Sequence, residues 1–318
     1  MEISVIITYH QEGQAFLEEA VNCVKNTIDV SNFEIIVVDD CSKEPLNPIS
    51  NVKIIRNFDN FGVGTSFDNG VAIAKYENII LMACDIRIIQ KNWASQMVEE
   101  LNKYPKSLIC TSCINLNREK PENMDIENRK KISVVNGAKI LIFHDHKTNP
   151  RMTVTFRGLI EASWLPSLKN RNVPSFEIPC ILGAFYGVKK EWYSYINGFY
   201  GHRGWGTLEP LIALKSWLFG GSCRTTPKIE VGHIFKKVGN HGTAQDTLIY
   251  NKMLTATLLF PDYGRLIAFL GSNPIVERAR SLYRADLPVI LHKREEYQKK
   301  TVFSIEQFVK KWDVDYRH

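Results

Sequence analysis

This sequence of 318 residues lacks the features that mark membrane and secreted proteins. It contains no run of about 18 apolar residues, which a membrane-spanning helix requires. Its first residues, Met1 to Val5, enter a strand-like pattern at once and show neither the basic flank nor the cleavage site of a signal peptide. Internal repeats and low-complexity segments are also missing. We therefore expect a globular protein with a cytoplasmic location.

The cysteines lack the pairing pattern of a disulfide framework or a zinc site. They number seven, an odd count, and several lie inside apolar runs, among them Cys110, Cys113 and Cys180. Cys110 and Cys113 form a C-x-x-C, but no second pair exists to complete a tetrahedral zinc site. We interpret the cysteines as free thiols, several of them buried.

A strong excess of charge is missing as well. The formal net charge is +6, which does not by itself indicate a nucleic-acid partner but permits an anionic substrate. Basic clusters are interpreted as solvated helix faces, with nucleic-acid contact as the alternative. These clusters lie at residues 129–131, 278–284, 293–294 and 299–300.

The N-terminal third, in contrast, carries a regular alternation of strand and helix patterns. The expected strands are residues 3–8, 34–38, 52–55 and 79–82, and the expected helices are 15–24 and 66–76. This alternation is typical of an open parallel α/β sheet, in which ligands bind beyond the carboxyl ends of the strands. We expect the polar residues at these ends to converge on one crevice, namely Thr8, Tyr9, His10, Asp39, Asp40, Asn57 and Asp85.

The rest of the chain is less regular. We expect a helix at 94–102, a strand at 108–114, and a hairpin-bearing insert at about 118–178 with β-like runs at 140–143 and 152–156. A strand at 181–188, a helix at 211–219 capped by Gly220 and Gly221, and a strand at 229–235 follow. The predicted domains are a catalytic α/β domain over 1–245 and a helical C-terminal extension over 246–318.

Four sequence blocks occur in an order and spacing that characterise one family. They are SVIITYHQE at 4–12, EIIVVDDCS at 34–42, the run from Arg56 to Arg87, and the run from Gly204 to Phe235. On these blocks the chain resembles family-2 glycosyltransferases of the GT-A fold, and within them the catalytic domain of polypeptide N-acetylgalactosaminyltransferases. The resemblance implies a Rossmann-like, mostly parallel sheet flanked by helices. It also implies transfer of a sugar from a nucleoside-diphosphate sugar, UDP in the first place.

The resemblance assigns several residues to the donor nucleotide. It implies that Asp40 and the backbone of Thr8 hold the uracil base, because an ionised carboxylate accepts an imide N–H well. A turn or helix cap is the structural alternative for Asp40, and Asp39 is expected to be structural or ribose-directed. The full set assigned to the donor is Thr8, His10, Glu12, Asp39, Asp40, Asn57, Arg87 and Trp205.

The metal-binding segment departs from the family pattern. Family members carry Asp-x-Asp or Asp-x-His here, whereas this chain reads Ala83-Cys84-Asp85, so that only the second carboxylate remains. In an alternative register Asp85 takes the first position and Arg87 the last, and Arg87 then contacts phosphate. His233, in Val-Gly-His-Ile-Phe, matches the distal histidine ligand of the family. Asp85 and His233 together predict a Mn²⁺ site, with Mg²⁺ as the alternative.

Glu209 is the candidate general base. An ungapped count places Leu208 at the family's glutamate and Glu209 at the following Asp or Asn, which implies an inverting mechanism. A glutamate that stabilises a helix N-terminus is the structural alternative. Trp205, between two glycines, is interpreted as a sugar platform or as a core residue. Residues 236–242 are expected to form a mobile loop that closes over the diphosphate.

The acceptor is not legible from the sequence. Polysaccharide, lipid-linked and protein acceptors follow from the family, and a modified nucleic-acid base, such as hydroxymethylated cytosine in viral DNA, is an alternative. A nucleotide-sugar-binding protein without catalysis is a second alternative, because Ala83 replaces a ligand. A nucleotidyltransferase is disfavoured, because TYHQEG after the first strand is not a glycine-rich, lysine-bearing loop.

Overall fold

The structure is a computed structural model that describes residues 1–316 except 89, 117–133, 146–156, 167–171 and 235–243. The described strands are β1 (Glu2–Tyr9), β2 (Asn32–Asp39), β3 (Lys53–Arg56), β4 (Asn78–Ala83), β5 (Ile86–Ile88), β6 (Ser107–Leu116), β7 (Val134–Asp145), β8 (Arg157–Pro166), β9 (Phe176–Glu177), β10 (Phe185–Lys189) and β11 (Ser222–Ile234). The described helices are α1 (Gln14–Thr27), α2 (Val63–Ile73), α3 (Trp93–Lys103), α4 (Lys190–Tyr195), α5 (Leu208–Leu218), α6 (Gln245–Leu259), α7 (Tyr263–Phe269), α8 (Pro274–Lys300) and α9 (Ile305–Trp312).

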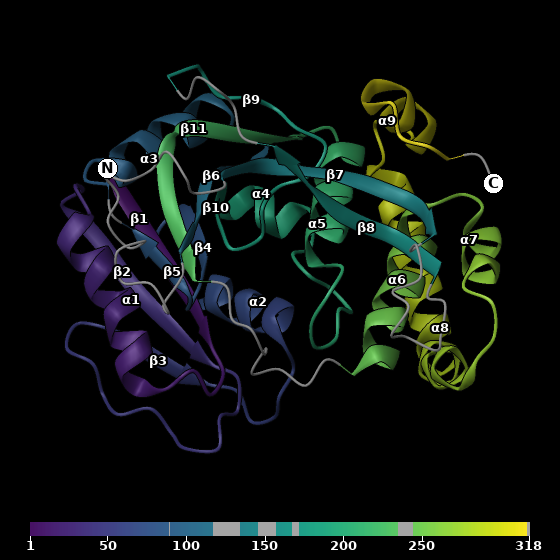
Figure 1. Cartoon of the computed structure of the whole chain (residues 1–318), viewed down its shortest axis with the longest axis horizontal. Helices are drawn as coiled ribbons and strands as arrows, with labels where there is room; N and C mark the ends of the chain where they lie inside the picture. Colours follow the sequence, from purple (N-terminus) through teal and green to yellow (C-terminus); the bar gives the residue numbers. More distant parts are fainter. Residues whose placement is uncertain (89, 117–133, 146–156, 167–171, 235–243, 317–318) are drawn as a thin grey trace.

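The strands form one central sheet with helices on both faces (Figure 1). The order along the sheet is β3-β2-β1-β4-β10-β6-β11-β5. Successive side chains of a strand point to opposite faces, and in β10 Phe185 contacts Trp93 of α3 while Tyr186 contacts Phe67 of α2. The apolar, β-branched runs of β1, β2 and β4 are therefore buried on both sides.

The parallel α/β prediction is confirmed for the N-terminal half of the sheet. β1 pairs in parallel with β2 and β4, and β2 pairs in parallel with β3. The second half is mixed, since β10 runs antiparallel to both β4 and β6 while β11 runs parallel to β6. The sheet as a whole is thus less parallel than the sequence pattern indicates.

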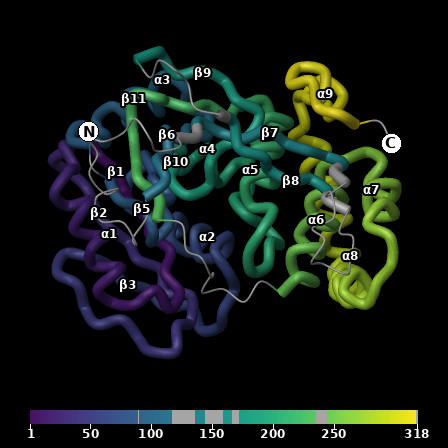
Figure 2. The backbone as a smooth tube through the Cα atoms, in the orientation of Figure 1, coloured from purple at the N-terminus to yellow at the C-terminus, as the bar shows by residue number. Residues whose placement is uncertain are grey.

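The pairing of β5 with β11 was not predicted from the sequence. β5 has three residues, and it pairs antiparallel with the end of β11 through His233 opposite Ile86 and Val231 opposite Ile88. Figure 2 traces β11 beside β5 and β6. β11 begins at Ser222, seven residues earlier than predicted from 229, because its pairing with β6 continues across an irregularity between Thr226 and Glu230.

The insert and the C-terminal helices pack on each other. The expected hairpin is present as β7 and β8, and the predicted run 140–143 lies in β7, whereas 152–156 lies outside the described residues. The hairpin reaches the C-terminal helices, where α6 and α7 contact β8 (Figure 1). α6 also contacts α5, and Trp217 of α5 packs against Trp312 of α9. The C-terminal helices therefore share a core with the sheet domain.

The cysteines agree with their interpretation as free thiols, several of them buried. All seven cysteines are free, and five of them, including Cys110, Cys113 and Cys180, are buried. Burial raises the pKa of the Cys110 thiol to about 11, so it stays protonated at neutral pH. In the part of the chain that the structure describes, no helix is long and apolar enough to cross a membrane.

Gly220 ends α5 as the sequence predicts. Its φ is 89°, its N–H donates to the Trp217 carbonyl at 3.2 Å, and the Gly221 N–H donates to the Ser216 carbonyl at 2.9 Å. This hydrogen-bond pair is the Schellman motif, which needs a left-handed residue at the position of Gly220.

We expect Gly220→Ala to lower the free energy of unfolding by roughly 1–2 kcal/mol, because an L side chain is strained at this φ. Gly264 in α7 is the matched control, since both sites are exposed and a Cβ at Gly264 meets nothing within 4 Å. Gly264→Ala should instead raise stability by up to about 1 kcal/mol. Urea denaturation measures both, and equal effects of the same sign would contradict the assignment of the cap.

Candidate active site

The polar ends of three parallel strands lie side by side. Thr8 at the end of β1 is paired with Val38 of β2 on one side and with Ala83 of β4 on the other. The Asp40 N–H donates to the Tyr9 carbonyl at 2.9 Å, and the Asn57 N–H to the Asp39 carbonyl at the same distance. The expected convergence of these strand ends is therefore present.

Asp40 holds the loop that precedes α2. Its buried carboxylate accepts hydrogen bonds from Asn57 Nδ2 at 2.8 Å, the Phe61 N–H at 3.0 Å and the Gly62 N–H at 2.7 Å. These three donors realise the turn-capping alternative, and contact with a base stays a prediction.

Asp39 and Asn57 are also engaged by protein groups. The Asp39 carboxylate accepts from the Ser42 N–H at 2.9 Å and from Arg56 at 2.6 Å, as expected for a structural residue. Asn57 donates to Asp40 and to Ser66, and its carbonyl accepts from Asn69 Nδ2 at 2.8 Å. Both side chains therefore hold neighbouring strand ends and loops together.

His10 and Glu12 form the turn after β1. His10 Nδ1 lies 2.8 Å from the Asp40 carbonyl oxygen, and its Nε2 lies 3.0 Å from the Gln11 amide nitrogen and 3.2 Å from that of Asn60. These partners imply that Nδ1 carries the proton and that Nε2 accepts. The Glu12 carboxylate accepts from the His10 N–H at 2.6 Å. The pair thus joins the β1 turn to Asp40 and to the loop before α2.

Asp85 and His233 lie next to each other, just after β4 and near the end of β11. The distance from Asp85 Oδ1 to His233 Nε2 is 3.2 Å, and the two side chains are 18% and 17% exposed. Asp85 lies in the turn between β4 and β5, and the Ile234 N–H donates to its carbonyl at 2.9 Å. The β5–β11 pairing therefore joins two residues that are 148 positions apart in sequence.

This pair fits a cation that is shared with a ligand. A carboxylate oxygen and an imidazole nitrogen are ligands that Mn²⁺ accepts, and both side chains are reachable from solvent. No cluster of three or more histidine, cysteine, aspartate or glutamate side chains suited to a metal occurs among the described residues. The geometry thus fits an open site completed by a ligand and not a closed structural site.

The structure does not support the predicted contact of Arg87 with phosphate. The guanidinium donates to the carbonyls of Cys84 and Phe16, forms a 2.8 Å ion pair with Glu19 and lies over the Phe16 ring. Its side chain is only 5% exposed and is directed toward α1. The register that makes Arg87 the last motif position is therefore disfavoured, and Arg87 is a structural residue.

Comparison with known proteins identifies the family of the chain. The family model described as Glycosyl transferase family 2 matches residues 4–193.

The chain belongs to glycosyl transferase family 2.

Several curated relatives are polypeptide N-acetylgalactosaminyltransferases. Human polypeptide N-acetylgalactosaminyltransferase 14 is 24% identical over 277 residues, which cover 82% of this chain and 46% of that protein. Mouse polypeptide N-acetylgalactosaminyltransferase 16 is 25% identical over 274 residues, covering 82% of this chain and 45% of the relative. The chain thus spans about half the length of these relatives.

Solved structures confirm the GT-A fold of this family-2 glycosyltransferase. A structure of GalNAc-T7 with UDP, GalNAc and Mn²⁺ superimposes with a TM-score of 0.70 at 18% identity, covering 98% of this chain and 56% of that one. A mannosyltransferase from Pyrobaculum calidifontis, solved with GDP-Man and Mn²⁺, gives a TM-score of 0.50 at 12% identity, with 99% and 88% coverage.

Glu209 lies in the first turn of α5, as both sequence interpretations require. Burial raises the pKa of its carboxyl above the ordinary 4.5, and a hydrogen bond from its own backbone N–H opposes this effect. The side chain lies over Gly183, where a Cβ would be 2.6 Å from Glu209 Oε1. Only glycine at 183 leaves Glu209 this space. The neighbouring Leu208 is buried in the core.

The structure excludes the interpretation of Trp205 as a core residue, because the side chain is 50% exposed. The loop that carries Trp205 contacts the loop before α2 through a backbone bridge between Gly62 and Gly204. The contact is so close that a Cβ at Gly62 would lie 2.1 Å from the Gly204 oxygen. The Gly204 N–H donates to the Phe61 carbonyl at 3.1 Å. The loop that Asp40 holds is therefore in direct contact with the loop that carries Trp205.

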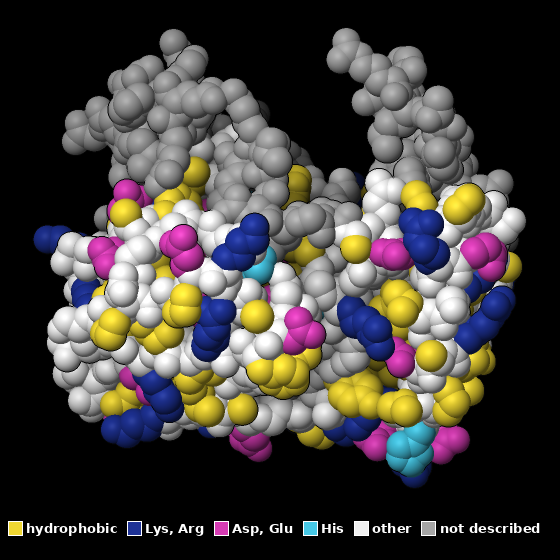
Figure 3. Space-filling view, turned by 90° about the horizontal axis from the view of Figure 1, so that it is seen from below, with side chains coloured by type: hydrophobic (Ala, Val, Ile, Leu, Met, Phe, Trp, Pro, Cys, Tyr) yellow, Lys and Arg dark blue, Asp and Glu magenta, His cyan; other side chains and the backbone are white. Residues whose placement is uncertain are grey.

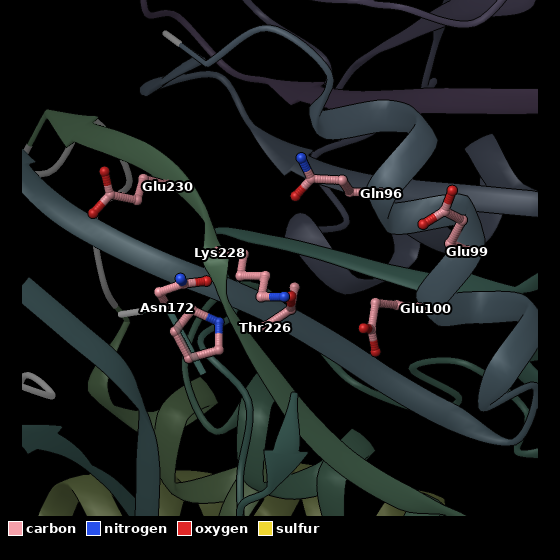
Figure 4. A pocket seen from close by; sticks show the side chains of 8 residues that line it. Gln96, Glu99, Glu100, Asn172, Thr226, Lys228 and Glu230 are labelled. Carbon is pink, nitrogen blue, oxygen red and sulfur yellow. The ribbon is translucent and has the colours of Figure 1, made fainter. Parts of the chain in front are cut away.

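A separate cavity of about 540 Å³ lies between α3 and the irregular part of β11 (Figure 4). Its lining includes Glu99 and Glu100 from α3 and Lys228 and Glu230 from β11. None of the predicted site residues lines it. The predicted loop 236–242 lies outside the described residues.

Gly183, His202 and Asn251 are site residues that sequence reasoning missed. Gly183 carries a sequence signal, because a glycine inside an apolar run indicates a close approach of another group. His202 and Asn251 both form hydrogen bonds with the Gly206 carbonyl in the loop that carries Trp205, residues 203–206, which is called the Trp205 loop below. Neither residue stands out by sequence pattern.

We expect Asp40→Asn to lower the free energy of unfolding by roughly 1–3 kcal/mol, because the NH2 group that replaces one carboxylate oxygen faces at least one of the three donors and cannot accept from it. Asp59→Asn is the matched control. Asp59 is exposed and accepts one local hydrogen bond, from the Asn60 N–H, so its effect should stay within about 0.5 kcal/mol. Urea titration of both variants measures the difference, and equal stabilities would show that Asp40 does not hold the loop.

Proposed function

We propose that this glycosyltransferase moves a sugar from a nucleoside-diphosphate sugar, a UDP-sugar in the first place, to an acceptor hydroxyl with the help of a divalent cation. The observation that carries the proposal is the 3.2 Å approach of Asp85 and His233 at the ends of the parallel strands. Two solved structures of the same fold hold UDP or GDP-Man together with Mn²⁺, which supports this choice of donor and cation.

Asp85 and His233 would hold the cation. When bound, it would neutralise charge on the diphosphate that leaves the sugar. Imidazole is a better ligand for Mn²⁺ than for Mg²⁺, so the His233 side chain favours Mn²⁺. The absence of an acid at Ala83 leaves two protein ligands, and the buried backbone behind them, fixed by β5 and β11, holds both in place.

Glu209 is proposed as the general base. Burial raises the pKa of its carboxyl, which strengthens it as a base, and its position next to Gly183 keeps the carboxylate in a confined space. The carboxylate would take the proton of the acceptor hydroxyl as the oxygen attacks the anomeric carbon on the face opposite the departing diphosphate. This assignment implies inversion of configuration.

Two alternatives for the function make different predictions. A nucleic-acid acceptor would need free basic groups. In the described clusters Arg280 and Lys293 of α8 pair with acids, and Arg294 donates to carbonyls of the α6 end, whereas the cluster at 129–131 lies outside the described residues. Figure 3 shows lysine, arginine, aspartate and glutamate interspersed over the described part of one face. A binding protein without catalysis would take up UDP with Mn²⁺ and hydrolyse no nucleotide sugar. The names of the curated relatives make a polypeptide hydroxyl the first acceptor to test.

We expect Asp85→Asn to lower Mn²⁺-dependent turnover of UDP-N-acetylgalactosamine or another UDP-sugar by on the order of 10²-fold or more, because a charged ligand is lost.

His233→Ala should weaken UDP binding with Mn²⁺ much more than UDP binding without it, as calorimetry would show. His292→Ala is the control, since that histidine is 76% exposed on α8. Equal losses in both titrations would make His233 a structural residue.

We expect Glu209→Gln to lower kcat for transfer by about 10²–10⁴-fold at unchanged UDP-sugar affinity, because the amide cannot take a proton. In the unmodified enzyme the acid limb of the kcat–pH profile should lie above pH 4.5, since the raised pKa protonates the base earlier as pH falls. Glu306→Gln, which removes the first-turn acid of α9, controls for the helix-terminus effect. Full transfer by Glu209→Gln would remove Glu209 from the mechanism and with it the case for inversion.

A further inference from the structure

Asn251 of α6 is fully buried, and its side chain forms hydrogen bonds with the backbone of the loop that carries Trp205. Its Oδ1 accepts from the Arg203 N–H at 3.0 Å, and its Nδ2 donates to the Arg203 carbonyl at 2.7 Å and to the Gly206 carbonyl at 3.2 Å. One amide group therefore binds the backbone on both sides of Gly204 and Trp205, at Arg203 and at Gly206.

The backbone of residues 203–207 has a positive φ at three positions, and at one of them, Thr207, the conformation is strained. Gly204 has a φ of 57° and Gly206 of 97°, and Thr207, a β-branched residue, has a φ of 63°. β-Branched residues rarely adopt this region, and such conformations persist only where the surroundings fix them. The strained segment ends where α5 begins, two residues before Glu209.

Other contacts hold the same loop from different sides. His202 Nε2 donates to the Gly206 carbonyl at 2.6 Å, and burial lowers the pKa of this imidazole to about 4, so it is neutral at pH 7. Gly62 touches Gly204 from the loop before α2. Among these contacts Asn251 makes more hydrogen bonds to the loop backbone than His202 does, and its chemistry is specific. A primary amide offers an acceptor and two donors, whereas a carboxylate of the same size only accepts.

We propose that Asn251 is a positioning residue for sugar transfer, which fixes the backbone of residues 203–206 and thereby the Trp205 ring and the start of α5. The inference rests on the proposed function. Asn251 lies in α6, which follows the residues 4–193 that the family model matches. The inference therefore gives a helix outside that match a role in sugar transfer.

The test compares Asn251→Ala and Asn251→Asp with Thr257→Val. Thr257 is the matched control, because it lies in the same helix, is fully buried, and donates to the Met253 carbonyl, next to the Tyr283 hydroxyl and away from the loop. Asn251→Asp keeps the acceptor for the Arg203 N–H and loses both donations, so it serves if the alanine variant does not fold. All measurements are made well below the unfolding midpoint of each variant.

The first readout is acrylamide quenching of Trp205 fluorescence, obtained as the difference from the same variants carrying Trp205→Phe. The second is hydrolysis of UDP-N-acetylgalactosamine and UDP-N-acetylglucosamine with Mn²⁺, together with calorimetry of UDP and Mn²⁺. We expect both Asn251 variants to show increased quenching and a fall in kcat of about 10- to 100-fold at unchanged UDP affinity. Thr257→Val should lose stability and leave both readouts unchanged.

Wild-type quenching in both Asn251 variants would overturn the inference, as would an equal fall in kcat in Thr257→Val. If the unmodified enzyme hydrolyses neither sugar nucleotide, the proposed function fails on its own. The quenching measurement still decides in that case whether Asn251 holds the Trp205 loop.

Discussion

The three-residue pairing between β5 and β11 is the contact on which the site depends. Without it, Asp85 would lie on a free turn after β4, and His233 at the end of a strand on the other side of β6. The antiparallel register sets Ile86 opposite His233, and this alignment brings the carboxylate and the imidazole within 3.2 Å. The few hydrogen bonds of this ladder gain their stability from the buried isoleucines of β5 and from the long β6–β11 pairing beside them.

A second principle of the structure is that buried polar groups bind loop backbones. Asp40 binds the N–H groups of Phe61 and Gly62, and Asn251 and His202 bind the backbone of the Trp205 loop. The two loops then touch through Gly62 and Gly204. Since an unpaired buried polar group costs about 1–3 kcal/mol, each of these groups fixes its loop strongly. Both loops are thus held at their backbones by buried side chains.

The fold could be predicted from the sequence where the local pattern is strong. β1, β2 and β4 are β-branched runs that are buried on both faces, and Gly220 marks the end of α5 in sequence and in structure. β5 could not be predicted, because three residues have no periodicity and exist as a strand only through β11. α2 lies three residues earlier than predicted, since the Gly62 turn fixes its start.

The candidate site divides in the same way. The proximity of Asp85 and His233 followed from the family motif, which encodes a tertiary contact that no single-segment pattern contains. The direction of Arg87 did not follow, because a motif match gives a position and not a side-chain partner; Glu19 and the Phe16 carbonyl decide it. Asn251 was missed because an asparagine within a helical segment has the pattern of a surface residue, and only packing reveals its burial.

The contact of Gly62 with Gly204 limits how this site can change. Neither backbone can move away without breaking the bond from the Gly204 N–H to the Phe61 carbonyl, and no side chain fits at position 62. An alteration that reshapes the Asp40 loop is therefore transmitted to the Trp205 loop. A substitution that reshapes one of these loops should therefore require a compensating substitution in the other, so the two loops are expected to change together.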